Sequence, residues 1–157
     1  MRKPALLAPL CLTLCAAACA PSLIPGTEIR DQPANRAVLQ VLSVYKTDAE
    51  ALDADAVIGL AAPDYFDNGS ASRSHAITTY AGLKKEVPEE FAKLKGLRMD
   101  ITVKDARVTG NKAEIDYFLV LHYSIGLPTG EKWLSESDDA RLHLALEDGQ
   151  WKVTSGL

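Results

Sequence analysis

Residues 113–125 read AEIDYFLVLHYSI, and their pattern gives the clearest indication of the fold. Every second side chain in it is apolar, and such an alternation predicts a β-strand with one face in a hydrophobic core. The residues on that face are Ala113, Ile115, Tyr117, Leu119, Leu121, Tyr123 and Ile125. The segments on both sides of this strand show the same alternation of apolar and polar side chains.

The flanking segments complete a sheet. In residues 97–109, apolar and polar side chains alternate up to Asp105-Ala106. The alternation shifts there by one residue, which predicts a β-bulge. Residues 132–147 form the next expected strand, whose apolar face is made of Ala140, Leu142, Leu144 and Leu146. Asp148-Gly149 is a strong two-residue hairpin signal that leads into a last strand. We therefore expect an antiparallel meander of four strands.

The segment before the sheet has the period of amphipathic helices. Residues 35–52 repeat apolar side chains at spacings of three and four, namely Val38, Val41, Leu42, Tyr45, Ala49 and Leu52. Asp53 is expected to cap a second, short helix. Ser74 is expected to cap a third helix, which Pro88 interrupts and restarts before it ends at Gly96. This order predicts the α+β class, with N-terminal helices packed on a curved antiparallel sheet of four or slightly more strands.

The cysteines are confined to the N-terminal part of the chain. All three lie within the first 19 residues, after a basic start and within an uncharged run that is too short to span a bilayer. These features predict a secretory signal peptide. The sequence Ala16-Ala17-Ala18-Cys19 resembles a bacterial lipobox, which implies cleavage before Cys19 and attachment of lipid to it. The alternative is ordinary signal-peptidase cleavage at Ala16-x-Ala18, which would leave a lone thiol on the exported chain.

The lipobox gives the expected organisation of the chain. Residues 1–18 are a lipoprotein signal peptide, residues 19–33 are the lipidated cysteine and a flexible tether, and residues 34–157 are one folded domain. We expect an exported protein that the lipid on Cys19 anchors to a membrane. Because Ala20 follows the cysteine, the aspartate that retains Gram-negative lipoproteins in the inner membrane is absent. This favours the outer membrane, on its periplasmic or its surface side.

Composition excludes several function classes. The formal net charge of −4 becomes −6 when Arg2 and Lys3 are removed with the signal peptide, so the mature chain lacks the basic surface that nucleic acids require. The three histidines, His75, His122 and His143, have no zinc-binding spacing. Neither a phosphate-binding loop nor a GxSxG motif is present. We therefore expect no metal, no cofactor and no nucleic-acid partner.

Several short motifs resemble the nuclear transport factor 2-like superfamily, which contains ketosteroid isomerases and SnoaL-like cyclases. The resemblance covers residues 33–157 and rests on Val41-Leu42-x-x-Tyr45, Ala51 to Ala56, Pro63 to Phe66 and Asp148 to Val153. It implies a cone-like domain with a pocket between the curved sheet and the helices. In detail the chain is similar to small bacterial lipoproteins of this fold whose role is unassigned.

The resemblance also implies positions for catalytic residues. The isomerases use a tyrosine in the first helix, an aspartate base about two dozen residues later and a protonated aspartate on an inner strand. Tyr45 matches the first position, and the count to the second reaches Gly69, with Asp67 two residues away. The third position falls near Leu142 or His143, neither of which is an acid. Tyr45 and Asp67 are therefore the catalytic candidates, and a packed phenol and a surface turn are the structural alternatives.

Aromatic side chains with polar tips, and their acidic neighbours, are candidates for lining a ligand pocket. These residues are Tyr45, Asp64, Phe66, Tyr117 and Tyr123. The first functional hypothesis is a non-catalytic module that binds a small apolar molecule or a protein. The second is a small isomerase, dehydratase or cyclase that uses Tyr45 and Asp67, and the third is a structural envelope lipoprotein. One open cavity shared by Tyr45 and Asp67 would favour the enzyme.

Two apolar residues interrupt the polar face of the strand at residues 113–125. Phe118 and Val120 would contact water there, beside Asp116 and His122, unless something covers them. Sheet-face dimers are common in the superfamily that the chain resembles. A homodimer through this face is therefore expected.

Overall fold

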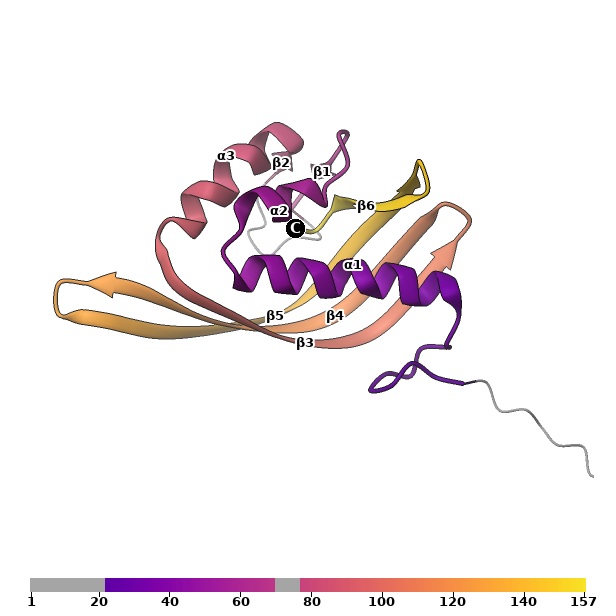
Figure 1. The fold of residues 1–157 in the computed structure, drawn as a ribbon, viewed down its shortest axis with the longest axis horizontal. Coiled ribbons are helices and arrows are strands. Elements are labelled where there is room, and N and C mark those ends of the chain that lie inside the picture. The colour runs from indigo at the N-terminus through magenta and orange to yellow at the C-terminus, as the bar shows by residue number, and fades with distance from the viewer. Residues whose placement is uncertain (1–21, 70–76) are drawn as a thin grey trace, which may run out of the picture.

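A computed structural model describes residues 22–69 and 77–157 of the chain. Cys19 and the expected cap Ser74 lie outside the described residues. Helices lie over one face of an antiparallel sheet (Figure 1): α1 (Pro33–Glu50), α2 (Ala54–Gly59) and α3 (Tyr80–Phe91). The sheet has four strands in the order β3 (Leu94–Thr109), β4 (Lys112–Leu127), β5 (Gly130–Glu147) and β6 (Gln150–Ser155). The predicted α+β class and the four-stranded meander are confirmed.

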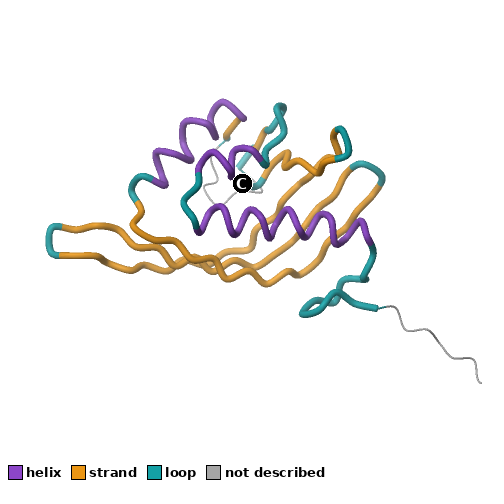
Figure 2. The backbone as a smooth tube through the Cα atoms, in the orientation of Figure 1, coloured by secondary structure: helices purple, strands orange, loops and turns teal. Residues whose placement is uncertain are grey.

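The sheet curves below the helices (Figure 2). Its apolar face contributes to the hydrophobic core. Tyr117 and Leu119 of β4 and Leu142 of β5 are each at most 2% exposed, as the alternation predicts. The turn at Asp148-Gly149 has φ of 47° and 78°, which is the left-handed geometry of a two-residue hairpin. Leu146 is an exception, because it pairs with Trp151 beside this turn, at the margin of the sheet, and is 38% exposed.

The predicted bulge in β3 is also confirmed. The pairing register between β3 and β4 shifts between Val103 and Asp105. An extra residue in one strand increases the local bend and twist of the sheet. The bulge therefore contributes to the curvature that leaves room between the sheet and the helices.

Helix α1 is fixed to β3 by a polar contact as well as by its apolar stripe. Glu50 accepts a hydrogen bond of 2.8 Å from the backbone N–H of Met99, and Lys46 donates to the carbonyl of the same residue. The next helix begins as predicted, because the Asp53 side chain accepts from the N–H of Ala56 at 2.9 Å. These contacts hold α1 and α2 in place over the sheet.

Helix α3 differs from the expectation at both ends and in its middle. Thr79 is its N-cap, accepting from the N–H of Gly82 at 3.2 Å, and the helix ends at Phe91. Pro88 lies inside one continuous helix instead of interrupting it. Because proline has no N–H, the carbonyl of Lys84 loses one helical hydrogen bond. Lys84 is exposed, so water can bond to this carbonyl instead. The apolar face of α3 packs against the core and outweighs this loss.

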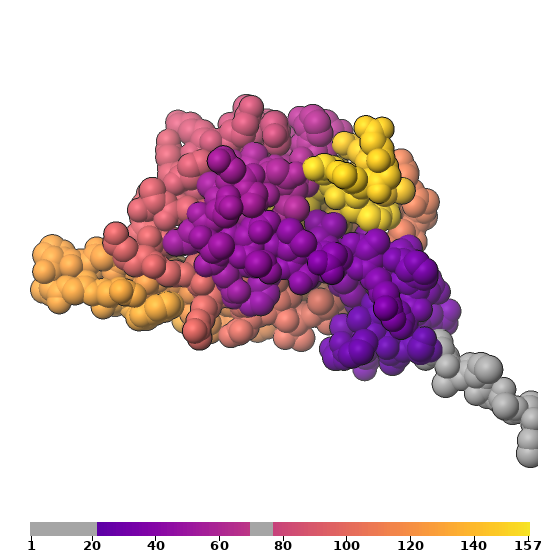
Figure 3. Space-filling model, in the orientation of Figure 1, coloured from indigo at the N-terminus to yellow at the C-terminus, as the bar shows by residue number. Residues whose placement is uncertain are grey.

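Two further features were not expected from the sequence. The short strands β1 (Phe66–Asp67) and β2 (Thr78–Thr79) form a separate antiparallel pair. The β4–β5 hairpin projects beyond the helices, at the end of the long axis opposite the N-terminal segment (Figure 3). Both features contribute side chains to the site described below.

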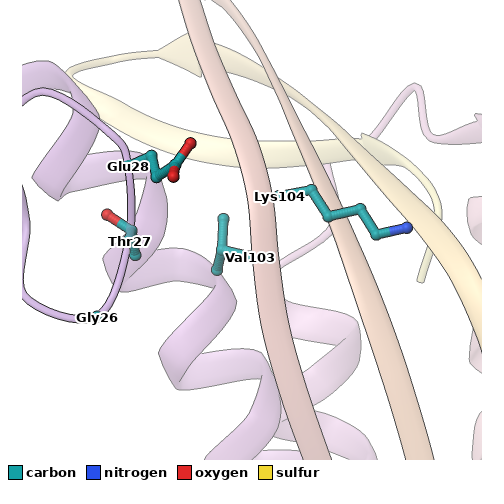
Figure 4. A pocket seen from close by; sticks show the side chains of 5 residues that line it. All are labelled: Gly26, Thr27, Glu28, Val103 and Lys104. Atoms are coloured by element: carbon teal, nitrogen blue, oxygen red, sulfur yellow. The ribbon is translucent and has the colours of Figure 1, made fainter.

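Residues 22–31, which the sequence assigns to the tether, fold into a loop on the side of β3. Leu23 pairs with Arg30, and Ile29 is only 6% exposed. Val103 lies on the side of β3 that faces this loop, whereas Lys104 extends to the opposite side (Figure 4). None of the described helices is long and apolar enough to cross a membrane.

Candidate functional site

A cavity of about 500 Å³ lies between the curved sheet and the helices. Residues from α1, α2 and α3 and from strands β1 to β5 line it, together with Tyr65 just before β1 and residues 156–157 that follow β6. Its walls are mostly aliphatic and aromatic, and they include the tyrosines Tyr45, Tyr65, Tyr117 and Tyr123. The side chains at one end are buried, and those at the other end are exposed, so the cavity has a closed floor and an open rim.

Asp67 forms part of the floor. Strand β1 alternates, so that Asp67 is 1% exposed while Phe66, next to it, is 54% exposed. The two carboxylate oxygens of Asp67 accept from the backbone N–H of Gly69 at 2.7 Å and of Gly156 at 2.8 Å. These two bonds fix the orientation of a buried carboxyl group that borders the cavity.

Tyr65 lies beside Asp67 on the floor and is 2% exposed. Its hydroxyl oxygen accepts from the backbone N–H groups of Gly156 at 3.2 Å and Leu157 at 3.0 Å. Burial raises the pKa of Tyr65 to about 12, and the nearby charge of Asp67 adds to the rise, while the two backbone hydrogen bonds oppose it. The phenol therefore keeps its proton near neutral pH and has an O–H donor as well.

Gly156 connects these two floor residues and has no substitute. Its φ is +99°, and an added Cβ would lie 2.0 Å from the carbonyl oxygen of Arg141. Only glycine allows the backbone to approach β5 this closely. Its N–H can therefore reach both Asp67 and Tyr65.

The open rim carries carboxylates from two elements. Glu86 and Glu90 come from α3, and Glu136 comes from the projecting part of β5. The Glu86 carboxylate accepts from the Thr78 hydroxyl at 2.8 Å, and Glu136 accepts from the Tyr123 hydroxyl at 2.6 Å. We call Glu86, Glu90 and Glu136 the acidic rim.

The structure brings together most of the residues that the sequence singles out. Tyr45, Asp67, Tyr117 and Tyr123 all line the one cavity. Asp64 and Phe66 are exposed and do not line it. Leu142 is fully buried behind the wall, so it does not fill the space.

Sequence reasoning missed several residues of the site. Tyr65, Gly156 and Glu136 are not among the candidate residues that the sequence predicts, although all three line the cavity. The spacing of Leu83, Glu86, Val87, Glu90 and Phe91 is a signal that could have found the α3 wall, because it places all five on one helix face. No local pattern marks Gly156, whose role depends on contacts 89 and 91 positions away.

The described part of the chain contains no group of three or more metal-ligating side chains that could hold an ion. His122 lies 3.4 Å from Asp100, and His143 lies 3.6 Å from Glu114. Neither histidine is among the residues that line the cavity.

No protein-family model and no curated protein matches the chain in sequence. Solved structures do match it in fold. A ketosteroid isomerase-like protein from Erwinia carotovora atroseptica has a TM-score of 0.64 and 13% identity, over 78% of this chain and 92% of that one. A protein from Streptomyces avermitilis, assigned as a dehydratase of the nuclear transport factor 2-like family, has a TM-score of 0.61 and 13% identity, over 76% and 90%. A conserved protein from Planctomyces limnophilus has a TM-score of 0.67 and 10% identity, over 77% and 91%.

These similarities show the fold of the chain. Three helices over an open, curved four-stranded sheet give the cone-like arrangement of nuclear transport factor 2-like proteins. The superfamily resemblance read from residues 33–157 is thereby confirmed at the level of fold. At this sequence identity the shared fold does not specify a chemistry, which depends on the residues of the cavity.

Proposed function

We propose that this domain binds a small organic molecule in the cavity between its sheet and its helices. The observation that carries the proposal is the cavity itself, which has a volume of about 500 Å³, apolar walls and a few convergent polar groups. Small-molecule sites in proteins have this size and this composition. If the same tyrosines filled a closed core, no cavity of this volume would remain.

The test uses two neighbouring positions on β4. Leu121 lines the cavity, whereas Val120 lies on the opposite face of the same strand. Leu121→Trp should therefore fill the mouth of the cavity and abolish binding of the ligands found in a thermal-shift screen of a metabolite library. Val120→Trp adds the same side chain outside the cavity and should leave binding unchanged. A screen without any ligand would contradict the proposal and favour a structural envelope lipoprotein.

Acid–base catalysis is a second candidate function, and the floor of the cavity favours it. Asp67 offers a fixed carboxylate as a base, and the phenols of Tyr45 and Tyr65 border the same space. A carboxylate that removes a proton next to a carbonyl, and phenols that donate to the resulting oxyanion, are the parts of an isomerase or dehydratase. The similar proteins named as isomerase-like and as a dehydratase agree with this chemistry.

Proton exchange tests the catalytic candidate before a substrate is known. A panel of cyclic ketones is incubated with the protein in D₂O, and deuterium entry next to the carbonyl is followed by NMR. Asp67→Asn should lower the exchange rate by about a hundredfold or more, as expected for loss of a general base. Tyr45→Phe should lower it by a smaller factor. Equal rates for wild type and Asp67→Asn would rule out Asp67 as the base.

The anchor is proposed from the sequence, since Cys19 lies outside the described residues. We propose that lipid on Cys19 holds the domain at the outer membrane, on its periplasmic or surface side. Mass spectrometry of the protein from membranes should find an acylated Cys19 as the first residue. Cys19→Ser should release the protein from the membrane fraction. An unmodified N-terminus in the wild type would contradict the anchor and leave the cavity proposal intact.

A further inference from the structure

Residues 22–31 form an N-terminal loop that backbone hydrogen bonds close on itself. The N–H of Asp31 donates to the carbonyl of Ser22 at 2.7 Å, and the N–H of Ile24 donates to the carbonyl of Ile29 at 2.9 Å. These two bonds bring the first residue of the N-terminal loop next to its last residues. The loop therefore has a definite shape, with both ends at the same place.

The N-terminal loop is also attached to the rest of the domain. Ile29 is 6% exposed and belongs to the hydrophobic core. The Asn35 side chain donates to the carbonyl of Arg30 at 2.9 Å, and Arg36 forms an ion pair with Asp31. Because Asn35 and Arg36 belong to the first turn of α1, these contacts fix the loop beside the start of that helix.

The proposed lipid anchor lies very close to this loop along the chain. Only Ala20 and Pro21 separate Cys19 from Ser22. Three residue steps of a fully extended chain reach about 11 Å at most. A lipid on Cys19 would therefore keep the start of the N-terminal loop, and with it the start of α1, next to the lipid headgroups.

The mouth of the cavity lies at the other end of α1. Glu50, the last residue of this helix, binds the N–H of Met99, which pairs with Leu121, and Leu121 pairs with Glu136 of the acidic rim. The 18 residues of α1 span about 27 Å. Helix α1 runs along the long axis of the molecule, from the N-terminal segment toward the projecting hairpin (Figure 1). The acidic rim is thus separated from the anchored end by about the length of α1.

The charge of the chain disfavours flat contact with a membrane. Without residues 1–18 the side chains have a formal net charge of −6. Anionic lipids repel a negatively charged protein that comes within about a Debye length, roughly 8 Å at physiological ionic strength. This repulsion moves the body of the domain away from the bilayer, while a lipid on Cys19 holds only the N-terminal loop close to it.

We infer that the N-terminal loop holds the domain end-on to the membrane, with the mouth of the cavity turned toward the aqueous phase. The inference rests on the proposed anchor and the proposed binding function, and it adds the source of the ligand. The ligand enters from the surrounding water and not from the bilayer. The surface that faces the lipid consists of the N-terminal loop and the adjoining start of α1.

A fluorophore at three exposed positions tests this orientation. Residues 20–157 contain no cysteine, so a cysteine introduced there is the only thiol of the lipoprotein once Cys19 is acylated. Leu23→Cys places the fluorophore in the N-terminal loop, Glu89→Cys on α3 beside the acidic rim, and Thr129→Cys at the tip of the hairpin. Each lipoprotein is reconstituted into vesicles of phosphatidylethanolamine and phosphatidylglycerol, with and without a lipid that carries a nitroxide on its headgroup. The nitroxide quenches only fluorophores that reach the headgroups.

Quenching should decrease along the long axis. The fluorophore at position 23 should lose about half of its emission or more, because the chain keeps it within about 11 Å of the acylated residue. The fluorophores at positions 89 and 129 should keep their emission. Quenching at position 89 or 129 as strong as that at position 23 would mean that the domain lies flat on the bilayer, and would overturn the inference.

A longer link is the matched control. Twenty glycine and serine residues inserted between Pro21 and Ser22 leave the lipid and the contacts of the N-terminal loop in place, but they allow an end-to-end distance of about 25 Å. Quenching at position 23 should then fall to the level of positions 89 and 129. Unchanged quenching at position 23 would overturn the inference, because the short link would not be what sets the distance of the loop from the lipid.

Mass spectrometry of the same samples separates the inference from the proposals on which it rests. If Cys19 is acylated and position 89 or 129 is quenched like position 23, the anchor stands and only the orientation is wrong. If Cys19 is not acylated, the anchor and the orientation are both overturned. The metabolite screen with Leu121→Trp and Val120→Trp decides the binding function by itself.

Discussion

Gly156 is the residue on which the floor of the cavity depends, because its N–H donates to both Asp67 and Tyr65. Gly156→Ala forces a Cβ to within 2.0 Å of a backbone carbonyl oxygen at a φ of +99°. Left-handed strain and overpacking together should lower the free energy of unfolding by about 3 kcal/mol. Urea denaturation measures this loss.

Gly59 provides the matched control for Gly156. It ends α2 with ordinary helical geometry, and an added Cβ there meets no atom within 4 Å. Gly59→Ala should therefore raise the free energy of unfolding by roughly 0.5 kcal/mol, because alanine reduces the entropy of the unfolded chain. Similar effects of the two substitutions would show that residue 156 is not held against β5.

Tyr65 predicts a dependence of stability on alkaline pH. Burial raises its pKa from 10.0 to about 12, so the unfolded chain ionises this phenol at a lower pH than the folded chain does. Above pH 10 the unfolded state therefore binds fewer protons than the folded state. The stabilisation that Tyr65 contributes is complete below pH 10 and is lost as the pH rises toward 12. Urea denaturation at a series of pH values should show this decline. Tyr65→Phe should flatten it, whereas Tyr80→Phe, outside the cavity, should not.

At the scale of elements, the cap of α2 is a test of how the short helices are held. Asp53→Ala removes the acceptor for the N–H of Ala56 and should lower the free energy of unfolding by about 1 kcal/mol. Asp55→Ala removes an acid from the same first turn without removing a cap bond, and it should cost less. Chemical denaturation of the two variants measures the difference, and equal costs would mean that charge near the helix N-terminus, and not capping, stabilises α2.

The elements that could be predicted are those whose signal is local and repeated. The alternation of β4 and the hairpin at Asp148-Gly149 depend on neighbouring residues alone, and both are observed. The expected start of α3 is wrong because serine and threonine are both preferred N-cap residues, so residue type alone does not show that Thr79 makes the capping bond. The effect of Pro88 was misjudged because tertiary packing outweighs one lost hydrogen bond.

The same distinction applies to the site. Tyr45 and Asp67 could be selected because the superfamily resemblance aligns their positions along the chain. Glu136 could not, because its polar neighbours indicate a solvated strand, while its register opposite Leu121 places it on the cavity side of the sheet. The face of the sheet on which such a side chain lies cannot be predicted until the pairing register of its strand is known.

The whole molecule presents a second sheet face, on the side away from the helices. Phe118 is 37% exposed there, although it lies on β4 between two neighbouring strands. Lys104 and Asp139 form an ion pair across this face, and the Lys104 ammonium lies 5.7 Å from the centre of the Phe118 ring. Together with the half-buried Val120, Phe118 forms an apolar centre with a charged margin. Interfaces that form and dissociate often have this composition.

We propose that two copies of the domain pair through this outer sheet face. Sedimentation of residues 22–157 at high micromolar concentration should show a dimer, and Phe118→Asp should convert it to a monomer by placing a charge in the apolar centre. Phe66→Asp is the control, because Phe66 is also exposed but belongs to β1, outside the four-stranded sheet. A wild-type domain that remains monomeric at this concentration would contradict the pairing. Retention of ligand binding by monomeric Phe118→Asp would show that each cavity is complete within one chain, since every residue placed in the site belongs to the helical face.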